Sequence, residues 1–338
     1  MAKEVTLKDI AEELNISIVT ASNALSGKKG VSEDVRKKII LKAQKMKYDI
    51  SKYVNKKDSE IKIGVISSNK YLEVGASFYW ALYQQVAYAA SKKNSVTIFE
   101  VLEDDITETE EMPKILMDKS IDCLIIIGYI EESYVKKIIN KSNIPIGLLD
   151  FHIRNEKCDS VVSNSYIGTY KITKYLIDRG HKEIGFIGSI YFNENIMDRY
   201  FGFRKCMMEH KIDIKKEWVL NDRNIEKNEI CVKLPKNMPT AFVCNCDLSA
   251  SFLYDELIKL GYRVPEDISI ISYDNYLYGH NFANQITTYN VDMKKMAKEM
   301  VKILLKRVKG INSHYGINHI DSEIVERNSV KKIEKDNN

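Results

Sequence analysis

The sequence predicts a multidomain chain of α and α/β class, with a small helical domain followed by two α/β lobes. The first 50 residues show helical periodicity and no strand pattern. From Ile61 onward, short apolar runs alternate with helical segments, which is typical of βα units. A length of 338 residues suits two or three domains, and an apolar fraction of 44% excludes wholesale disorder.

Two short helices joined by a sharp turn are expected at the N-terminus. Thr6 is placed to cap "LKDIAEEL", and Asp9 three residues later completes a capping-box pattern. Asn15 interrupts the periodicity, and asparagine tolerates the left-handed backbone of a tight turn. Ser17 is the expected N-cap of a second helix that ends near Leu25. This order of elements predicts the first half of a helix-turn-helix unit.

A third, supporting helix is expected after the loop "GKKG". Ser32 is its predicted N-cap, and the helix carries an apolar stripe at Val35, Ile39, Ala43 and Met46. Residues 51–60 are polar and have no stripe, so we expect a linker there. Residues 1–50 therefore form one predicted domain.

The positive charge is concentrated near the N-terminus. The whole chain has a formal charge of +4, and residues 61–338 contain 38 basic and 38 acidic residues. Residues 28–57 contain 11 basic and 3 acidic residues. A basic N-terminal segment on a neutral body favours an anionic polymer as partner, although a solvated lysine-rich helix surface is the alternative.

The body of the chain predicts parallel sheets covered by helices. Its strands are continuous apolar runs rather than alternating ones: "IKIGVIS", "SVTIFEV", "IDCLIIIG", "IPIGLLDF", "DSVVS", "EIGFIG", "TAFVC" and "ISIISYD". About 270 residues of such units indicate two lobes. Tyr129 and Tyr191 each follow a predicted strand, where ligand-binding loops lie in such sheets.

Several classes of chemistry have no support in the sequence. Phosphate-binding glycine motifs are missing after the first strand, so no nucleotide cofactor is expected. The six cysteines and six histidines show neither metal-ligand spacing nor a nucleophile–base pattern, so we predict no metal and no enzyme activity. The charged N-terminus does not resemble a signal peptide, and no apolar run reaches 18 residues. A cytoplasmic location without membrane contact is therefore expected.

The second helix has the chemistry of a DNA-reading helix. Its exposed start would present Ile18 and Val19 to thymine methyl groups, and Asn23 could bond an adenine edge. The hydroxyls of Ser17, Thr20 and Ser22 suit phosphate contacts. Packing of Ile18 or Val19 into the small helical core is the alternative.

At this point the chain resembles LacI/GalR-type bacterial transcription repressors. "TLKDIA", the S-x-x-T-x-S pattern from Ser17, and "VSEDVRKKI" through to Tyr48 match that family's headpiece in register. The resemblance implies base reading by Ile18, Val19 and Asn23, the last being an arginine in most relatives. Thr6, Lys28 and Lys57 complete the predicted DNA-contacting set.

The resemblance continues to about residue 328. "LIDRGHKEIGFIG", "DRYFGF", "VPEDISIISYDN" and "QITTYNVDM" are similar to the family's effector domain. This implies a two-lobed, periplasmic-binding-protein-like architecture over residues 61–330, with crossings between lobes near 160, 285 and 320. A polar tail, 331–338, lacks the apolar heptads of a tetramerising zipper, so a homodimer is expected.

The effector cleft is expected to hold a polyol through carboxylates and an arginine. The resemblance points to Arg199 and Asp274, with Phe78 or Tyr79 lining the cleft. Asp150, Tyr191 and Asp247 are further candidates, although Asp247 is equally a candidate N-cap. An aromatic residue of the family is replaced near Arg223, and Cys246-Asp247 stands where relatives have Asn-Asp. A sugar is the expected effector, with a purine or sugar phosphate as alternatives.

Residues 51–57 match the family's hinge helix, which enters the minor groove of the operator. The wedging leucine of the family aligns with Lys57, and its proline with Ile50. Weaker bending, or a wedge moved to Tyr53 or Val54, is therefore expected. The predicted function is a repressor that binds a pseudo-palindromic operator under effector control. A transporter's solute-binding protein is the alternative.

Overall fold

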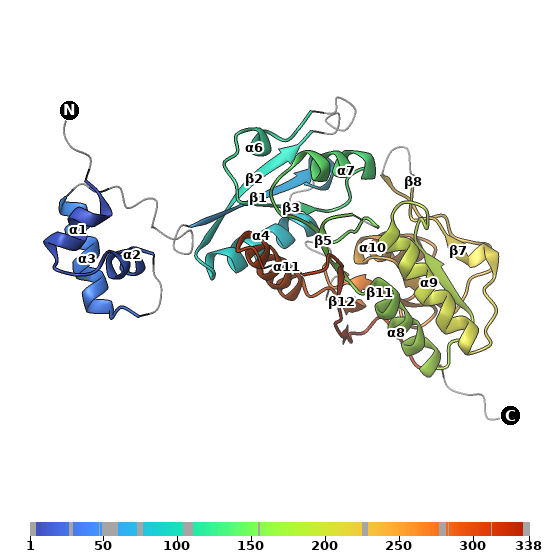
Figure 1. Ribbon diagram of the computed structural model, residues 1–338. Helices are drawn as coiled ribbons and strands as arrows, with labels where there is room; N and C mark the ends of the chain where they lie inside the picture. The colour runs from blue at the N-terminus through green and yellow to red at the C-terminus, as the bar shows by residue number, and fades with distance from the viewer. Residues whose placement is uncertain are drawn as a thin grey trace. The chain divides into compact units, whose positions relative to one another are not determined.

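The chain divides at about residue 61 into two compact units (Figure 1). The computed structural model describes residues 5–26, 30–46, 48, 60–72, 77–103, 111–154, 156–224, 229–276, 282, 284–311 and 313–333. Each unit is described by itself. Within these residues no helix has the length and apolar character needed to cross a membrane.

The first unit consists of three helices, α1 (Leu7–Glu13), α2 (Ile18–Leu25) and α3 (Glu33–Lys45). The capping box between Thr6 and Asp9 is confirmed, as is Ser17 as the N-cap of α2. Asn15 takes the left-handed backbone, at φ +51°, that the sharp turn requires. The core contains Ile10, Ala24, Leu25, Ile39 and Ala43.

Two details of the third helix differ from the prediction. Ser32 occupies the N-cap position, but its side chain makes no capping hydrogen bond. Val35 is 39% exposed, while Ile39 and Ala43 are buried. The buried stripe is therefore shorter than predicted, because α1 and α2 cover only part of α3.

Lobe 1 of the second unit is built on a six-stranded sheet of order β13-β5-β4-β3-β1-β2. Its strands are β1 (Ile61–Ser68), β2 (Ser95–Leu102), β3 (Cys123–Ile127), β4 (Ile146–Leu149), β5 (Asp159–Ser163) and β13 (Ile317–Ile320). The pairs from β13 through β5, β4 and β3 to β1 are parallel. β3 is buried throughout, as its continuous apolar sequence predicts.

Among the described residues, the helices that cover the sheet of lobe 1 are α4 (Phe78–Ser91), α6 (Lys114–Met117), α7 (Glu132–Lys141) and α11 (Met293–Val308). A short 3-10 helix, η2 (Asn69–Tyr71), follows β1. α4 and α11 pack against one another on one face (Figure 1). α7 packs its buried residues with Leu124, Ile126 and Leu148 in the other layer of the core.

Lobe 2 contains a second six-stranded sheet of order β14-β12-β11-β10-β6-β7. Its strands are β6 (Ile184–Ile187), β7 (Val219–Leu220), β10 (Ala241–Cys244), β11 (Ser269–Asp274), β12 (Thr287–Asn290) and β14 (Ile324–Val325). The covering helices are α8 (Ser165–Asp178), α9 (Glu194–Glu209) and α10 (Asp247–Lys259). The 3-10 helix η3 (Lys216–Trp218) and the two-stranded sheet of β8 (Arg223–Asn224) and β9 (Glu229–Ile230) complete the lobe.

The chain passes between the two sheets three times: after β5, after β12 and after β13. Strands of both lobes therefore end where the lobes meet, and ligands of open α/β sheets bind at the carboxyl ends of such strands. Helix α9 carries Arg199 toward this region. Gly202 allows α9 to pack closely against α8, because a Cβ at this position would collide with the carbonyl oxygen of Tyr166 in α8.

Candidate functional site

The start of α2 presents an exposed apolar surface. Ile18 is 47% exposed and Val19 is 68% exposed, whereas Ala21, Ala24 and Leu25 of the same helix are buried. The alternative in which Ile18 or Val19 packs into the headpiece core is therefore wrong. Two branched side chains are held in solvent by a helix whose opposite face is fully used for packing.

Local hydrogen bonds fix the first turn of α2. The Thr20 amide donates to Ser17 Oγ at 3.0 Å, and the hydroxyls of Ser17 and Thr20 lie 2.8 Å apart. The hydroxyl of Thr6 donates to Asp9 Oδ2 at 2.6 Å, so it is engaged within α1. The sequence did not point to Arg36, whose Nη1 donates to the carbonyl of Ala24 at 2.9 Å and so ties α3 to the end of α2.

Of the other predicted DNA-contacting residues, two lie on α2 and two lie outside the described residues. Ser22 and Asn23 are partly exposed on α2, next to the exposed Ile18–Val19 surface. Lys28 and Lys57 lie outside the described residues, as do Ile50 and the predicted hinge at 51–57. Their roles stay predictions.

On the lobe 2 side of the cleft, Arg199 and Asp274 form a buried ion pair. Arg199 Nη2 lies 3.3 Å from Asp274 Oδ1, and the two side chains are 7% and 17% exposed. Arg199 Nη1 also donates to the carbonyl of Asn245 at 2.5 Å, and the guanidinium lies 3.9 Å from the centre of the Tyr273 ring. Asp274 ends β11 with φ at +113°, which turns the chain away from the sheet at this point.

Lobe 1 contributes Asp150 and Tyr79. Asp150 follows β4 directly, has φ at +69°, and is buried. The Tyr79 hydroxyl bonds to its carboxylate, and Phe78 packs edge-on against Tyr79 with ring centres 5.3 Å apart. The structure therefore brings Phe78, Tyr79, Asp150, Arg199 and Asp274 into one interlobe cluster.

Burial dominates the protonation of this cluster. It raises the pKa of Asp150 to about 6, against the opposing attraction of Arg199. It likewise raises the pKa of Asp274 to about 8, again opposed by Arg199. The pKa of the Tyr79 hydroxyl rises well above its usual value, through burial and the nearby Asp150. The cluster thus holds two carboxyl groups that are much weaker acids than exposed ones.

The prediction that Asp247 is the N-cap of α10 is wrong. Cys246, not Asp247, caps α10 through its Sγ, and Asp247 is the first helical residue. The Asp247 carboxylate is buried and accepts hydrogen bonds from the hydroxyls of Ser272 and Thr288 and from the amide of Tyr276. These bonds tie Asp247 to β11, to β12 and to the turn that follows Asp274. Its role as a ligand contact stays a prediction.

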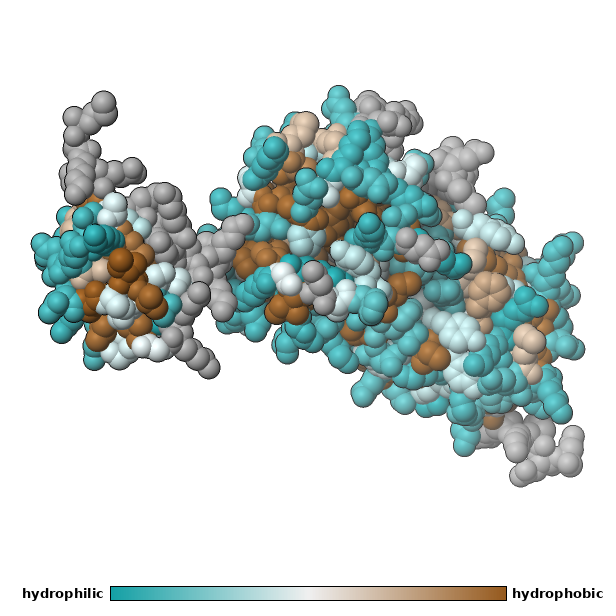
Figure 2. Space-filling model, viewed as in Figure 1, coloured by the Kyte–Doolittle hydropathy of each residue, from teal (hydrophilic) through white to brown (hydrophobic). Residues whose placement is uncertain are grey.

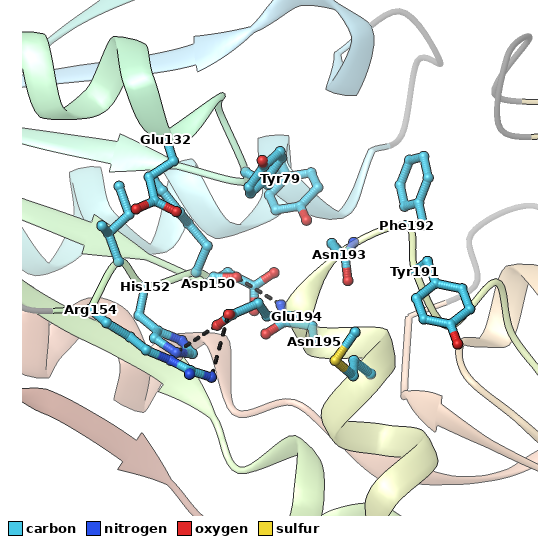
Figure 3. Close-up of a pocket in the computed structure, with 14 residues that line it drawn as sticks. Tyr79, Glu132, Asp150, His152, Arg154, Tyr191, Phe192, Asn193, Glu194 and Asn195 are labelled. Atoms are coloured by element: carbon cyan, nitrogen blue, oxygen red, sulfur yellow. Dashed lines mark hydrogen bonds and ion pairs between the residues drawn. The ribbon is translucent and has the colours of Figure 1, made fainter.

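A pocket of about 460 Å³ opens beside this cluster (Figure 3). It is lined from lobe 1 by Tyr79, Tyr129, Glu132 and residues 150–154, and from lobe 2 by residues 191–195 and Met197. Its size falls in the usual range for small-molecule sites. Tyr191 lines the pocket and is 86% exposed, which places it at the rim.

Polar contacts hold the two lobes together around the pocket, as Figure 3 shows. His152 Nε2 of lobe 1 lies 2.7 Å from Glu194 Oε2 of lobe 2, and Arg154 Nη2 lies 3.6 Å from Glu194 Oε1. Asn195 Nδ2 donates to the carbonyl of Asp150 at 2.8 Å. The sequence named Asp150 but predicted none of these contacts, because each one joins residues 150–154 of lobe 1 to the first turn of α9 in lobe 2.

Asp222 and Arg223 form a second buried ion pair. The sequence drew attention to the position near Arg223 but did not predict this pair. Arg223 donates twice to Asp222, from Nε at 3.2 Å and from Nη2 at 2.8 Å. The guanidinium lies 4.5 Å from the centre of the Phe192 ring. The only signal in the sequence was the replacement of a family aromatic near Arg223.

The fold and the cleft define a class of protein: a two-lobed, periplasmic-binding-protein-like domain that follows a helix-turn-helix headpiece. A family model described as "Periplasmic binding protein-like domain" matches residues 173–330. Two relatives share full-length similarity, and both are described as the HTH-type transcriptional repressor PurR. The one from Vibrio parahaemolyticus is 28% identical over 97% of this chain and 99% of its own. The one from Photobacterium profundum is 25% identical over the same shares.

Solved structures show the same fold. A complex of the transcriptional regulator CelR with cellobiose aligns with a TM-score of 0.69 and 17% identity, over 96% of this chain and 100% of that one. The lac repressor dimer bound to operator and the anti-inducer ONPF aligns at 0.66 and 19%, over 97% and 100%. The chain is therefore similar over almost its whole length to transcription repressors and shares the fold of these regulators.

Proposed function

We propose that the protein is a sequence-specific DNA-binding transcription repressor whose operator affinity changes when a small molecule binds between its two lobes. The exposed Ile18–Val19 pair at the capped start of α2 carries this proposal. A transporter's solute-binding protein has no use for such a helix. Full-length similarity to relatives described as HTH-type transcriptional repressors supports the same function. We propose binding rather than catalysis as the activity.

Recognition would take place in the major groove. The side chains of Ile18 and Val19 suit thymine methyl groups, and the Asn23 amide suits the bidentate edge of adenine. Backbone amides at the start of α2 suit a phosphate, because the N-terminus of a helix attracts anions. We therefore expect an operator half-site rich in A·T at the contacted positions.

Alanine at Val19 or at Asn23 should weaken the A·T preference at one contacted position by about 5- to 100-fold, the value of one good base contact. Selection from a pool of randomised operators, followed by sequencing, measures this directly. Glu12→Ala is the matched control, because Glu12 is exposed on α1 and should leave selectivity unchanged. Unaltered base preference in both test variants would contradict the proposed helix face.

Effector control would act through the interlobe cluster. Asp150 and Tyr79 belong to lobe 1, while Arg199 and Asp274 belong to lobe 2, so a ligand that contacts both sides changes the lobe angle by population shift. A sugar or related polyol is the ligand class we propose, because buried carboxylates and an arginine bind paired hydroxyls well. A thermal-shift screen of sugars, nucleobases and phosphosugars tests this class.

A homodimer is the proposed assembly, because one headpiece buries too little DNA for tight specific binding. Lobe 1 exposes Trp80, Tyr88, Ile98 and Val101, and Figure 2 shows hydrophobic residues over the β2 region. Phe252 is exposed on α10 of lobe 2. These apolar side chains are candidates for burial between copies.

Tyr88→Asp and Phe252→Asp should each shift the protein toward monomer and lower operator affinity at least about tenfold, since each would bury a charge in an apolar contact. Sedimentation velocity over a concentration series measures the assembly. Tyr191→Asp, at the exposed pocket rim, is the control and should leave it unchanged. A wild-type tetramer, or variants that remain dimeric, would count against this interface.

A further inference from the structure

The contact between the two lobes beside the pocket has opposite charges on its two sides. Lobe 2 contributes Glu194 and Asp198, which lie one turn apart on α9. Lobe 1 contributes His152 and Arg154, from the segment after β4, and His319 of β13. Figure 3 shows His152 and Arg154 pointing toward Glu194. The lobe 2 side is therefore acidic, and the lobe 1 side consists of one arginine and two imidazoles.

Glu194 joins the two sides directly. Its Oε2 lies 2.7 Å from His152 Nε2, and its Oε1 lies 3.6 Å from Arg154 Nη2. The His152 side chain is only 10% exposed, and its Nδ1 has no hydrogen-bond partner within the described residues. Because the ring is nearly buried, water and salt screen its attraction to Glu194 less than they screen a fully exposed pair.

Asp198 feels the same groups of lobe 1. Burial raises the pKa of its carboxyl group, and His152, His319 and Arg154 each oppose this rise, while Glu194 adds to it. The three lobe 1 groups therefore favour the ionised form of a carboxylate that belongs to the other lobe. The attraction between the lobes extends in this way over one turn of α9.

Protonation of the imidazoles changes the balance of charge between the lobes. Histidine is the side-chain type that ordinarily changes its charge between pH 5 and pH 8. With neutral imidazoles, lobe 1 sets the charge of Arg154 alone against two carboxylates. With protonated imidazoles, His152 and His319 add two positive charges. We propose that His152 and Glu194 form a pH-sensitive latch between the lobes, which favours the closed arrangement more strongly as the pH falls from 7.5 to 5.5.

The latch would also make operator affinity depend on pH, a consequence that rests on the proposed function. A change in the population of closed lobes changes the population that binds the operator. Residues 1–60 contain no histidine, so the headpiece has no imidazole of its own to titrate. A pH dependence of operator binding that is lost in His152→Gln would therefore arise in the two-lobed unit.

Single-molecule energy transfer in the full-length protein measures the ratio of closed to open lobes without operator or effector. The dyes are attached through p-acetylphenylalanine at two exposed positions, Lys141 of α7 and Lys216 of η3, so the native cysteines stay in place. An excess of unlabelled protein limits each assembly to one labelled chain. Between pH 7.5 and pH 5.5 the ratio should rise about threefold or more, the value of one partly exposed ion pair.

Two variants test the latch itself. Glu194→Gln keeps an oxygen for His152 but removes the charge, and His152→Gln removes the titrating ring, so the rise should fall below about 1.5-fold in each. His314→Gln is the matched control and should keep the full rise, because His314 is an exposed histidine of lobe 1 outside the pocket lining.

A wild-type ratio that stays constant or falls on acidification overturns the inference. So does a rise that persists in both latch variants, or one that is lost equally in His314→Gln. The operator selection is carried out at one pH and needs no change in the lobes, so it judges the proposed DNA-binding function separately.

Discussion

Replacing Asp159 with alanine is expected to lower the free energy of unfolding of the two-lobed unit by about 3–5 kcal/mol. Asp159 begins β5, and its carboxylate accepts two hydrogen bonds from Arg307 of α11, at 2.8 Å from Nε and 3.1 Å from Nη2. Both side chains are only 5% exposed. The loss of Asp159 would leave a buried guanidinium without its counterion.

Arg307 is also a hub for the segment that leads into β13. It donates to the carbonyls of Ser313 at 2.7 Å and His314 at 3.3 Å, and its guanidinium lies 3.9 Å from the centre of the Tyr315 ring. The ion pair therefore joins α11, β5 and the chain that returns to the edge of sheet 1. Because three segments depend on one guanidinium, the expected loss exceeds that of an ordinary pair.

Urea unfolding at pH 7 measures this loss, and Asp178→Ala is the matched control. Asp178 pairs with Lys174 one helical turn away at 2.6 Å, but both of these side chains are about half exposed. Exposed pairs of this kind contribute only a few tenths of a kcal/mol. A loss below about 1 kcal/mol for Asp159→Ala would show that solvent or rearrangement compensates the arginine.

The stability of the folded protein is expected to depend on pH through Asp150. Burial raises the folded-state pKa of Asp150 to about 6, above its ordinary value of 3.8. The folded protein therefore holds a proton that the unfolded chain has already released between these values. This contribution to stability is fully present below about pH 4 and is lost as pH rises through about 6.

Asp150→Asn removes this titration. The free energy of unfolding of the variant, relative to wild type, should rise by about 2 kcal/mol between pH 4.5 and pH 7.5, which is the part of the two-unit pKa shift that falls in this range. Asp274, with its pKa near 8, should cause a further decline toward alkaline pH in both proteins. Urea unfolding at pH 4.5, 6 and 7.5 measures the difference. Curves that stay parallel across this range would show that Asp150 is not perturbed by burial.

The parts of the fold that depend on neighbouring residues were predictable from the sequence. The cap of α1 by Thr6, the cap of α2 by Ser17 and the left-handed Asn15 involve contacts within three residues, so the local sequence contains all the necessary information. The buried parallel strands were predictable for a similar reason, because continuous apolar runs cannot face water on either side. The family motifs added the two-lobed architecture.

The sequence predicted which residues belong to the candidate site, but not how these residues contact one another. Phe78, Tyr79, Asp150, Arg199 and Asp274 were named from sequence, and the structure brings them together. The hydrogen-bond partners of the candidate residues could not be predicted: the Asp247 carboxylate accepts hydrogen bonds from Ser272 and Thr288, which lie 25 and 41 residues away. The pairing of Glu194 with His152 likewise joins different lobes.

The sequence by itself therefore determined the caps of α1 and α2, the apolar strands and the identity of the charged residues at strand ends. Only the tertiary structure decided which of those charges are paired with one another. The physical reason is that burial and pairing depend on segments that meet across the two sheets. Asp150 and Asp247 are the same residue type near strand ends, yet within the described residues Asp150 Oδ1 has no hydrogen-bond partner, whereas the Asp247 carboxylate accepts three hydrogen bonds.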